Sequence, residues 1–407
     1  MRPSPKGFRL HIGIFGRRNV GKSSLLNALV RQNVSIVSAE PGTTTDPVEK
    51  PMELQPLGPV LFIDTAGLDD EGGLGGLRIE RSAAVIERTD LAILVTDAQW
   101  TPFEAQLAER FRARKLAFVV VFNKSDQQTP DAELLRALRR EMRVEQASAV
   151  QEGGVEALRR ALSELVPDEY VQAPPILADL VGPGELAVFV VPIDKEAPKG
   201  RLILPQVQAI RDLLDHDAMA LVVKERELRL ALERLKTPPR LVVTDSQAFL
   251  KVAADTPDEI PLTSFSILFA RLKGELESFV SGAKAIETLR DGDKILVAES
   301  CAHHPIGEDI GRVKIPRWLS QYSGAELSFS TVQGADFPDD LSPYRMVVHC
   351  GACMTNRRAM LNRIRRCEEQ GVAISNYGIV IAYSLGIFER ALRPFPAAHE
   401  LAMRAVE

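Results

Sequence analysis

The stretch from residue 10 to residue 30 constrains the fold most, because a short strand, a glycine loop and a helix are expected to follow one another directly. Residues 10–15 are mainly apolar, the loop Gly16-Arg-Arg-Asn-Val-Gly21-Lys22-Ser23-Ser24 comes next, and residues 25–29 have the apolar spacing of a helix. The glycines let backbone N–H groups approach phosphate oxygens, and the helix N-terminus favours their negative charge. We therefore predict a phosphate-binding loop, in which Lys22 reaches the β and γ phosphates and the Ser23 hydroxyl binds Mg²⁺. The candidate nucleotide contacts in this loop are Gly16, Asn19, Val20, Gly21, Lys22, Ser23 and Ser24.

Three later segments narrow the ligand to a guanine nucleotide, since each follows a predicted strand and occurs in the expected order. The first has a carboxylate that can hold Mg²⁺ through water and a glycine N–H that can sense the γ-phosphate. The second ends in an aspartate that can accept both N–H donors of guanine, a donor pair that adenine lacks. Each segment alone could be a polar turn. Together with the phosphate-binding loop they make four motifs in the expected order, which predicts a guanine nucleotide site. The candidate contacts are Asp64 and Gly67 after the strand at 60–63, Asn123, Lys124 and Asp126 after the strand at 117–122, and Ser148 and Ala149 after the strand at 142–145.

These motifs resemble the translation-factor-like GTPase superfamily, and Pro41-Gly42-Thr43-Thr44-Thr45-Asp46 resembles the first switch of one of its branches. The resemblance implies that Thr44 binds Mg²⁺ in the GTP state, that Asn19 helps to hold K⁺, and that Lys22, Thr44 and Gly67 are the catalytic residues. Leu68 stands where Ras-like enzymes have a glutamine that orients water. Hydrolysis is therefore expected to be slow, or to be helped by a monovalent cation, another residue or a partner.

The length of 407 residues exceeds what one hydrophobic core usually supports, so two or three domains are expected. A Pro- and Gly-rich linker follows Pro167, and a second alternation of strands and helices begins at residue 187. This middle part has no glycine fingerprint and no cluster of titratable side chains at its strand ends, which favours a role in assembly over catalysis. Its predicted strands are 187–191, 219–223 and 241–244, and its predicted helices are 205–214, 225–235 and 246–253.

The last part of the chain carries all four cysteines, Cys301, Cys350, Cys353 and Cys367. We predict a long helix at 264–289, strands at 294–298, 326–332 and 345–348, and a helix at 354–370. Two strand ends could then bring Cys301 and Cys350 to one crevice, since ligands of open α/β sheets bind outside the carboxyl ends of the strands. Cys367 continues the apolar spacing of the last helix and is expected in the core. For the arginines of that helix, a solvated face is favoured over a docking surface.

The pattern Cys301-x-His303 followed by His349-Cys350-x-x-Cys353 supplies thiolate and imidazole donors, which suit an iron–sulfur cluster and a structural zinc ion equally well. Taken with the GTPase motifs and the middle part, the segments Cys301-Ala-His-His-Pro-Ile-Gly307 and His349-Cys-Gly-Ala-Cys353 resemble the HydF family, the maturation GTPases of FeFe-hydrogenase. The resemblance covers the whole chain.

The resemblance implies a homodimeric scaffold that binds a 4Fe-4S cluster through Cys301, Cys350 and Cys353. Its fourth iron site would be labile or weakly ligated, with His303 the first candidate and His304 or His349 less favoured. The protein would receive a diiron precursor processed by two radical-SAM maturases and pass it to the FeFe-hydrogenase apoprotein, with GTP hydrolysis regulating partner exchange. The expected α/β fold then has three domains: a Ras-like P-loop GTPase domain at 1–170, a small dimerisation domain at 171–264 and an iron–sulfur cluster-binding domain at 265–407.

Two alternatives stay open: a GTPase of tRNA modification or ribosome assembly, and a zinc-stabilised, GTP-dependent interaction protein. The net charge of −5 argues against a protein that binds nucleic acid, because phosphate binding depends on clustered Lys and Arg. No apolar run approaches the roughly 20 residues that a membrane span requires, so no membrane partner is expected. The expected location is the cytoplasm, where structural disulfides between the cysteines are not expected.

Overall fold

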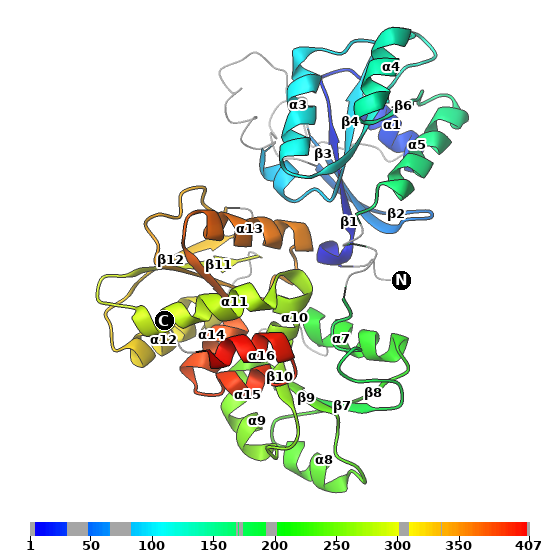
Figure 1. Cartoon of the computed structure of the whole chain (residues 1–407). Coiled ribbons are helices and arrows are strands. Elements are labelled where there is room, and N and C mark those ends of the chain that lie inside the picture. Colours follow the sequence, from blue (N-terminus) through cyan, green and yellow to red (C-terminus); the bar gives the residue numbers. More distant parts are fainter. Residues whose placement is uncertain are drawn as a thin grey trace. The chain divides into compact units, whose positions relative to one another are not determined.

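The computed structural model describes residues 5–30, 48–65, 83–167, 170, 174–192, 202–300, 309–334 and 336–404. The chain divides into two compact units, Met1–Ala173 and Pro174–Glu407, and each is described by itself (Figure 1). All three sheets are built mainly from parallel strands, which confirms the predicted α/β fold class. None of the described helices is long and apolar enough to cross a membrane.

The first unit has a six-stranded sheet in the order β2-β3-β1-β4-β5-β6. Only β2 is antiparallel to its neighbour β3. Helices α1 and α5 pack on one face of the sheet, and α3 and α4 pack on the other, so that two separate cores form. The strands are β1 (Leu10–Phe15), β2 (Val48–Leu54), β3 (Gly58–Asp64), β4 (Leu91–Thr96), β5 (Ala117–Phe122) and β6 (Arg143–Gln146), and the helices are α1 (Lys22–Val30), α3 (Pro102–Ala113), α4 (Ala132–Glu141) and α5 (Glu152–Glu164).

The second unit begins with a four-stranded parallel sheet in the order β10-β9-β7-β8. Its two inner strands, β7 and β9, are almost fully buried, whereas Met219 and Val222 of the edge strand β8 are 51% and 42% exposed. The strands are β7 (Leu186–Val190), β8 (Met219–Val223), β9 (Leu241–Thr244) and β10 (Leu262–Ser264), and the helical elements are α7 (Leu204–Asp215), α8 (Leu228–Arg234), η2 (Ser246–Ala248) and α9 (Phe249–Asp255).

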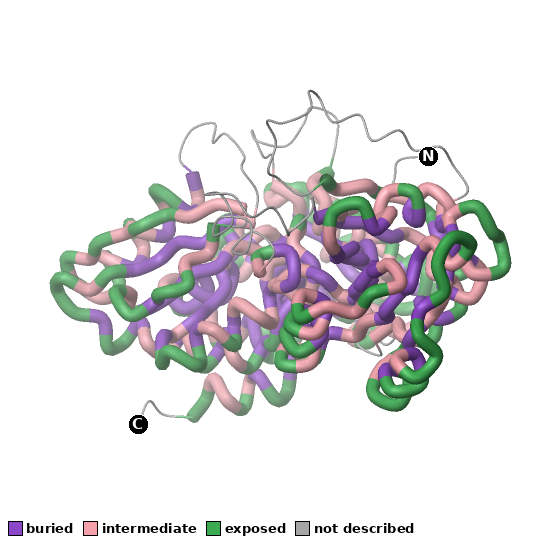
Figure 2. Tube along the Cα trace, turned by 90° about the horizontal axis from the view of Figure 1, so that it is seen from above, coloured by how far each residue is buried: buried purple, intermediate pink, exposed green. Residues whose placement is uncertain are grey.

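A second four-stranded parallel sheet follows in the order β12-β11-β13-β14. Most residues of β11, β13 and β14 are buried, whereas no residue of the edge strand β12 is. Figure 2 colours the described part of the chain by burial. The strands are β11 (Lys294–Glu299), β12 (Ser328–Gln333), β13 (Met346–His349) and β14 (Ala373–Asn376). The helical elements are α10 (Phe265–Lys273), α11 (Leu276–Ala283), η3 (Lys284–Thr288), η4 (Ile310–Lys314), α12 (Ile315–Ser323), α13 (Arg357–Glu369), α14 (Tyr377–Ser384), α15 (Phe388–Leu392) and α16 (Pro396–Met403).

The predicted helix at 264–289 is wrong as a single helix, because the chain breaks between α10 and α11 at Gly274. A Cβ at Gly274 would lie 2.6 Å from the ring of Phe279, so only glycine fits there without displacing that ring. The Arg357 guanidinium donates to the carbonyl oxygens of Leu272 and Gly274 at 2.8 and 2.9 Å. These contacts satisfy carbonyl groups that a continuous helix would have paired internally.

The strands at 10–15, 117–122, 219–223 and 241–244 have the predicted bounds. Other predicted elements differ from the structure by one to a few residues. The helix expected at 246–253 is instead the short 3₁₀ turn η2 followed by α9, which continues to Asp255. The short strands β10 and β14 were not predicted. Their sequences, Leu-Thr-Ser and Ala-Ile-Ser-Asn, lack the apolar run that marked the equally short β9, Leu-Val-Val-Thr.

Candidate nucleotide site and candidate metal centre

Two glycines give the phosphate-binding loop a backbone that other residues adopt only with strain. The φ angle is +144° at Gly16 and +90° at Gly21, and a Cβ on Gly21 would collide with the Asn123 side-chain amide. Asn19 has a φ of +62°, in the left-handed region that asparagine tolerates better than most residues. The loop connects β1 directly to the N-terminus of α1 at Lys22. This is the strand–loop–helix arrangement that the sequence predicted.

The Lys22 ammonium group lies within the loop. Its Nζ donates to the carbonyl oxygens of Gly16 and Arg17, each at 2.7 Å. These contacts hold a positive charge where the backbone of the loop curves around the expected phosphate position. The arrangement can bind phosphate oxygens through one ammonium group and the backbone N–H groups at the start of α1.

The Ser23 hydroxyl and the Asp64 carboxylate form a pair suited to a magnesium ion. Ser23 Oγ donates to Asp64 Oδ2 at 3.4 Å, and the other oxygen, Asp64 Oδ1, is buried and accepts no hydrogen bond in the part of the chain that the structure describes. Burial raises the pKa of Asp64 above its usual value, and the charge of Lys22 opposes that rise. A buried carboxylate oxygen without a donor, beside a hydroxyl group, fits the oxygen ligands that Mg²⁺ prefers.

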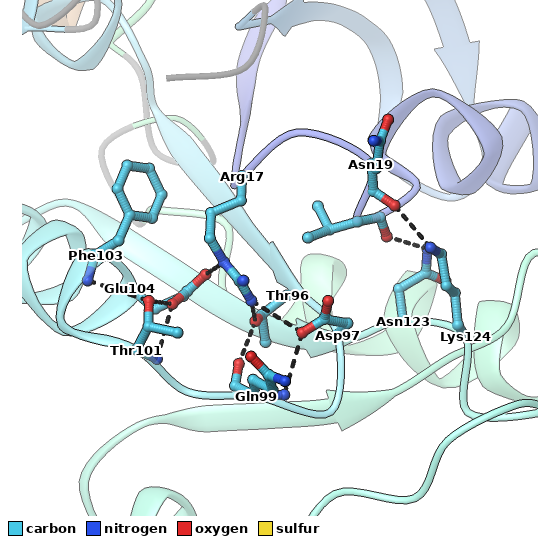
Figure 3. Close-up of polar contacts among 11 residues, drawn as sticks. Arg17, Asn19, Thr96, Asp97, Gln99, Thr101, Phe103, Glu104, Asn123 and Lys124 are labelled. Carbon is cyan, nitrogen blue, oxygen red and sulfur yellow. Dashed lines mark hydrogen bonds and ion pairs between the residues drawn. The ribbon is translucent and has the colours of Figure 1, made fainter. Parts of the chain in front are cut away.

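The predicted guanine-binding segments meet the phosphate-binding loop. Asn123, which is 3% exposed, donates through Nδ2 to the Val20 carbonyl oxygen at 2.8 Å. Lys124 Nζ donates to the Asn19 carbonyl oxygen at 2.7 Å, a contact that Figure 3 shows. The Ser125 N–H donates to the Ala147 carbonyl oxygen at 3.1 Å and so joins this segment to the next one.

Of the remaining guanine contacts, Asp126 is exposed and Ser148 is buried. An exposed carboxylate at the end of β5 is accessible to a base that arrives from solvent. Ala149 follows Ser148 in the turn that leads to α5. Thr44, Gly67 and Leu68, together with the segment 41–46, lie outside the described residues.

Arg17 forms a network that the sequence did not predict (Figure 3). Its Nε donates to Glu104 Oε1 at 2.6 Å, and its Nη2 donates to Asp97 Oδ1 at 2.9 Å. Glu104 is fully buried and also belongs to the capping box of α3, where it accepts from the Thr101 N–H at 2.9 Å. The network joins the phosphate-binding loop to the first turn of α3. The capping pattern of Thr101 and Glu104 was visible in the sequence, but nothing there indicated an arginine 87 residues away as the partner.

The second candidate site lies at the carboxyl ends of β11 and β13. These strands are parallel neighbours, and Ala298 of β11 pairs with His349 of β13. The Cys350 N–H donates to the Ala298 carbonyl oxygen at 2.9 Å, and the Ser300 N–H donates to the Cys350 sulfur at 3.1 Å. A backbone N–H aimed at sulfur stabilises a thiolate or a metal-bound sulfur. The polypeptide immediately before Cys301 is therefore in contact with Cys350.

Cys353 belongs to the same loop as Cys350. Both cysteines are partly exposed free thiols. Burial, together with the nearby Cys350, raises the pKa of the Cys353 thiol to about 11, so a metal would have to displace a proton on binding. Cys301, His303 and His304 lie outside the described residues. Within the described part of the chain, no group of three or more His, Cys, Asp or Glu side chains is arranged to bind a metal.

His349 and Cys367 are both fully buried. His349 Nδ1 lies 2.8 Å from the Cys350 carbonyl oxygen, and its Nε2 lies 2.7 Å from Arg363 Nη1. Burial and the Arg363 charge lower the pKa of His349 to about 3. Cys367 lies on α13, and burial raises the pKa of its thiol to about 12. The prediction that Cys367 is a core residue is confirmed.

The favoured interpretation of the α13 arginines as a solvated face is wrong for three of them. Arg357 donates to carbonyl groups at the end of α10, and Arg363 donates to the Gly334 carbonyl oxygen at 2.6 Å. Arg366 forms an ion pair with Asp339 at 2.8 Å. Long arginine side chains can cover apolar surface and bind carbonyl groups, so periodicity alone does not distinguish such a face from a solvated one.

Comparison with known families identifies the second unit. The family model of the hydrogen maturase F dimerization domain matches residues 176–274, and that of the hydrogen maturase F tetramerization domain matches residues 277–394. The chain belongs to the hydrogen maturase F (HydF) family. A third model, 50S ribosome-binding GTPase, matches residues 11–124, so the first unit of this HydF-family protein is a P-loop GTPase domain. Two of the three matches describe oligomerisation domains.

Individual relatives match the GTPase domain. The tRNA modification GTPase MnmE of Alkaliphilus metalliredigens is 37% identical over 161 residues, which are 39% of this chain and 34% of MnmE. GTPase Der of Wolinella succinogenes is 42% identical over 124 residues, 29% of this chain and 26% of Der. This HydF-family chain thus spans about a third or less of the length of these curated relatives.

Among solved structures, an Aquifex aeolicus Era variant bound to GDP.AlF4- is 20% identical and has a TM-score of 0.33. The match covers 53% of this chain and 93% of that one. A TM-score of this size adds nothing to the fold assignment, which depends on the strand order described above.

Proposed function

We propose that this HydF-family protein is a GTP-hydrolysing iron–sulfur scaffold that carries the diiron precursor to FeFe-hydrogenase during its maturation. The observation that carries the proposal is the meeting of β11 and β13, whose carboxyl ends lead to Cys301 and Cys350. The contact from Ser300 N–H to the Cys350 sulfur supports it, because it brings the two segments together at the sulfur atom. The loop then continues from Cys350 to Cys353, which supplies the third thiol.

The residues present fit a 4Fe-4S cluster held by Cys301, Cys350 and Cys353. Three thiolates leave one iron without a strong protein donor, so a bound cluster would supply an open corner that accepts an exogenous ligand. His303 is our first candidate for a weak fourth ligand. The chain itself supplies the Ser300 N–H that donates to the Cys350 sulfur, and two neighbouring parallel strands whose carboxyl ends lead to Cys301 and Cys350.

In the GTPase domain we assign the chemistry to the phosphate-binding loop and its partners. Lys22 would stabilise the charge that develops on the transferring phosphoryl group, and Ser23 and Asp64 would hold Mg²⁺. Thr44 would complete the magnesium site, Gly67 would sense the γ-phosphate, and Asn19 would help to hold K⁺. Hydrolysis in this proposal is slow and stimulated by K⁺, and it regulates the exchange of partners.

We further propose that the protein is a cytoplasmic homodimer that pairs along β8. The matched dimerization model covers this strand, which lies at an open edge of its sheet and exposes Met219 and Val222. An edge strand with apolar exposed side chains is suited to pair with the same strand of a second copy. The partners would be two radical-SAM maturases and the FeFe-hydrogenase apoprotein, and the domains would be 1–170, 171–264 and 265–407.

The alternatives receive less support. MnmE and Der resemble this chain only over its GTPase domain, so their roles do not extend to residues 174–407. A zinc-stabilised interaction protein would use the same thiols and is the rival that an experiment must exclude.

The deciding experiment is to purify the full chain without oxygen, reconstitute it with iron and sulfide, and measure iron, sulfide, zinc and the absorption spectrum. We expect about four iron atoms per chain in a cubane cluster and a paramagnetic signal after reduction. Stoichiometric zinc without iron would contradict the proposal.

A second experiment tests the GTPase domain separately. Lys22→Ala should abolish GTP turnover, while the reconstituted iron content remains that of the unchanged chain. Turnover of the unchanged chain should be faster in K⁺ than in Na⁺ and specific for GTP over ATP. Equal rates in the two salts would refute the role of Asn19 and leave the cluster proposal untouched.

A further inference from the structure

Arg363 is a positively charged side chain directed toward the cysteine loop. From α13 its Nη1 reaches His349 Nε2 at 2.7 Å, and its Nη2 reaches the Gly334 carbonyl oxygen at 2.6 Å. Its guanidinium carbon also lies 5.0 Å from the centre of the Phe337 ring. Two donated hydrogen bonds and an aromatic face hold the group in one orientation.

No carboxylate pairs with Arg363 among the described residues. Burial lowers the pKa of Arg363, a thiolate at the candidate ligand Cys350 opposes that fall, and the positive charge of Arg366 adds to it. Arg366 contacts the same Phe337 ring at 5.9 Å, but it is paired with Asp339. Withdrawal of a cation from water is costly unless an anion compensates it. The positive charge of Arg363 is thus available to compensate negative charge at the cysteine site.

His349 connects Arg363 to Cys350 through hydrogen bonds at its two ring nitrogens. A guanidinium only donates hydrogen bonds, so Nε2 of His349 must be the acceptor, and Nδ1 must carry the proton that it donates to the Cys350 carbonyl oxygen. Both ring nitrogens are then engaged, and the lone pair that could bind iron is directed at Arg363. The same two bonds fix the backbone of Cys350.

We propose that Arg363 is the positioning residue and the counter-charge of the cysteine cluster site, and that through His349 it holds Cys350 in place and keeps His349 from becoming the fourth iron ligand. This inference rests on the proposed iron–sulfur function. A positive charge beside the thiolates stabilises the more negative, reduced state of a cluster, and the net charge near a cluster is one determinant of its reduction potential.

The test compares three variants of the full chain after anaerobic reconstitution. Arg363→Gln removes the charge and keeps one donor for His349, Arg363→Lys keeps the charge, and Arg366→Gln is the matched control on the same helix and ring. The readouts are iron content and the midpoint potential in a mediated redox titration. For Arg363→Gln we expect about a tenfold fall in the equilibrium constant for one-electron reduction, which is about 59 mV toward lower potential. Arg363→Lys and Arg366→Gln should stay near the value of the unchanged chain.

A measurement on the unchanged chain tests the same inference without depending on the folding of a variant. Pulsed paramagnetic resonance of the reduced protein should show no nitrogen coupling from His349 to the cluster, with His349→Gln as the reference. A coupling that disappears in His349→Gln would overturn the inference, as would equal potentials for Arg363→Gln and Arg366→Gln. A chain that binds no iron under any condition would instead refute the proposed function itself.

Discussion

The two four-stranded sheets of the second unit have the same connectivity but very different carboxyl edges. If the strands of each sheet are numbered along the chain, both sheets have the order 2-1-3-4, in which the direction of winding changes between the first and third strands. In the first sheet those strands end in Val190 and Thr244, whereas in the second they lead to Cys301 and Cys350. The same topology thus leads to the candidate metal centre in one sheet and to apolar and hydroxyl side chains in the other.

The carboxyl edges of the two sheets differ because α14 covers part of this edge in the first sheet. The segment after β9 is in contact with the start of α14, where a Cβ on Gly378 would lie 3.0 Å from Ser246 Oγ. Ser266 Oγ, at the start of α10, donates to Asn376 Oδ1 at 2.9 Å and accepts from the Gly378 N–H at 3.1 Å. A helix of the second sheet therefore packs at the carboxyl edge of the first. The crevice that the topology provides is filled there, whereas the edge strand β8 exposes Met219 and Val222 within the described part of the chain.

The largest expected effect is on iron binding at the second sheet. Cys301→Ala, Cys350→Ala and Cys353→Ala should each lose most of the bound iron after reconstitution, because each removes one of the three proposed thiolate ligands. Cys367→Ala is the control, since its thiol is buried on α13, and it should retain the iron. Iron analysis of desalted protein measures the outcome, and loss of iron in Cys367→Ala would contradict the ligand assignment.

The next effect concerns association at the first sheet. Val222→Asp places a charge on the exposed edge strand β8, and we expect at least a tenfold weaker homodimer because edge pairing would bury that carboxylate. Leu250→Asp is a matched control, since Leu250 is 55% exposed on α9 and away from the edge. Light scattering during size-exclusion chromatography gives the mass. Both variants should retain iron, and equal masses for the two would exclude β8 as the interface.

A smaller effect should appear at the contact between the sheets. Gly378→Ala would place a methyl group 2.7 Å from Ser266 Cβ, and such overpacking typically costs about 1–3 kcal/mol. In Gly182→Ala the new methyl group would meet only the flexible Glu185 carboxylate at 3.5 Å, so its effect should stay within about 0.5 kcal/mol. Urea denaturation measures both. Equal midpoints would show that α14 can move away from the first sheet at no cost.

Apart from the Gly182→Ala control, the smallest effect is expected for Ser266→Ala. It removes the bond to Asn376 and the acceptor for the Gly378 N–H, but Asn376 Oδ1 still accepts from that N–H at 2.8 Å. One net hydrogen bond is lost, which costs about 1 kcal/mol. The same denaturation experiment should show a midpoint between those of Gly182→Ala and Gly378→Ala. A larger loss than in Gly378→Ala would mean that the polar contacts, rather than packing, hold the sheets together.

Much of this architecture could be predicted because its signals are local. The phosphate-binding loop and the strands β8 and β9 follow from glycine spacing and short apolar runs. The break at Gly274 could not be predicted, because the residue that requires it is the ring of Phe279 and the group that satisfies the freed carbonyls is Arg357, which is distant in sequence. Periodicity describes one helix at a time and carries no information about such partners.

The candidate sites show the same limit. The donor atoms, such as Lys22 and Cys350, are recognisable from residue type and spacing. The groups that orient them could not be recognised in this way. Glu104 binds Arg17 and Arg363 binds His349, and each pair is formed between elements that only the fold brings together. The sequence therefore predicts the functional side chains more reliably than the side chains that orient them.

The loop between the two described cysteines of the candidate centre has a consequence for the entropy of metal binding. Ala352 is 2% exposed and has a φ of +53°, and its carbonyl oxygen accepts from the Thr355 N–H at 3.0 Å. This left-handed turn is formed by the polypeptide itself. Ordering a residue costs about 1–2 kcal/mol of conformational free energy, and for residues 350–353 that cost is met when the chain folds. The proposed binding of iron at Cys350 and Cys353 would therefore not have to provide this ordering free energy.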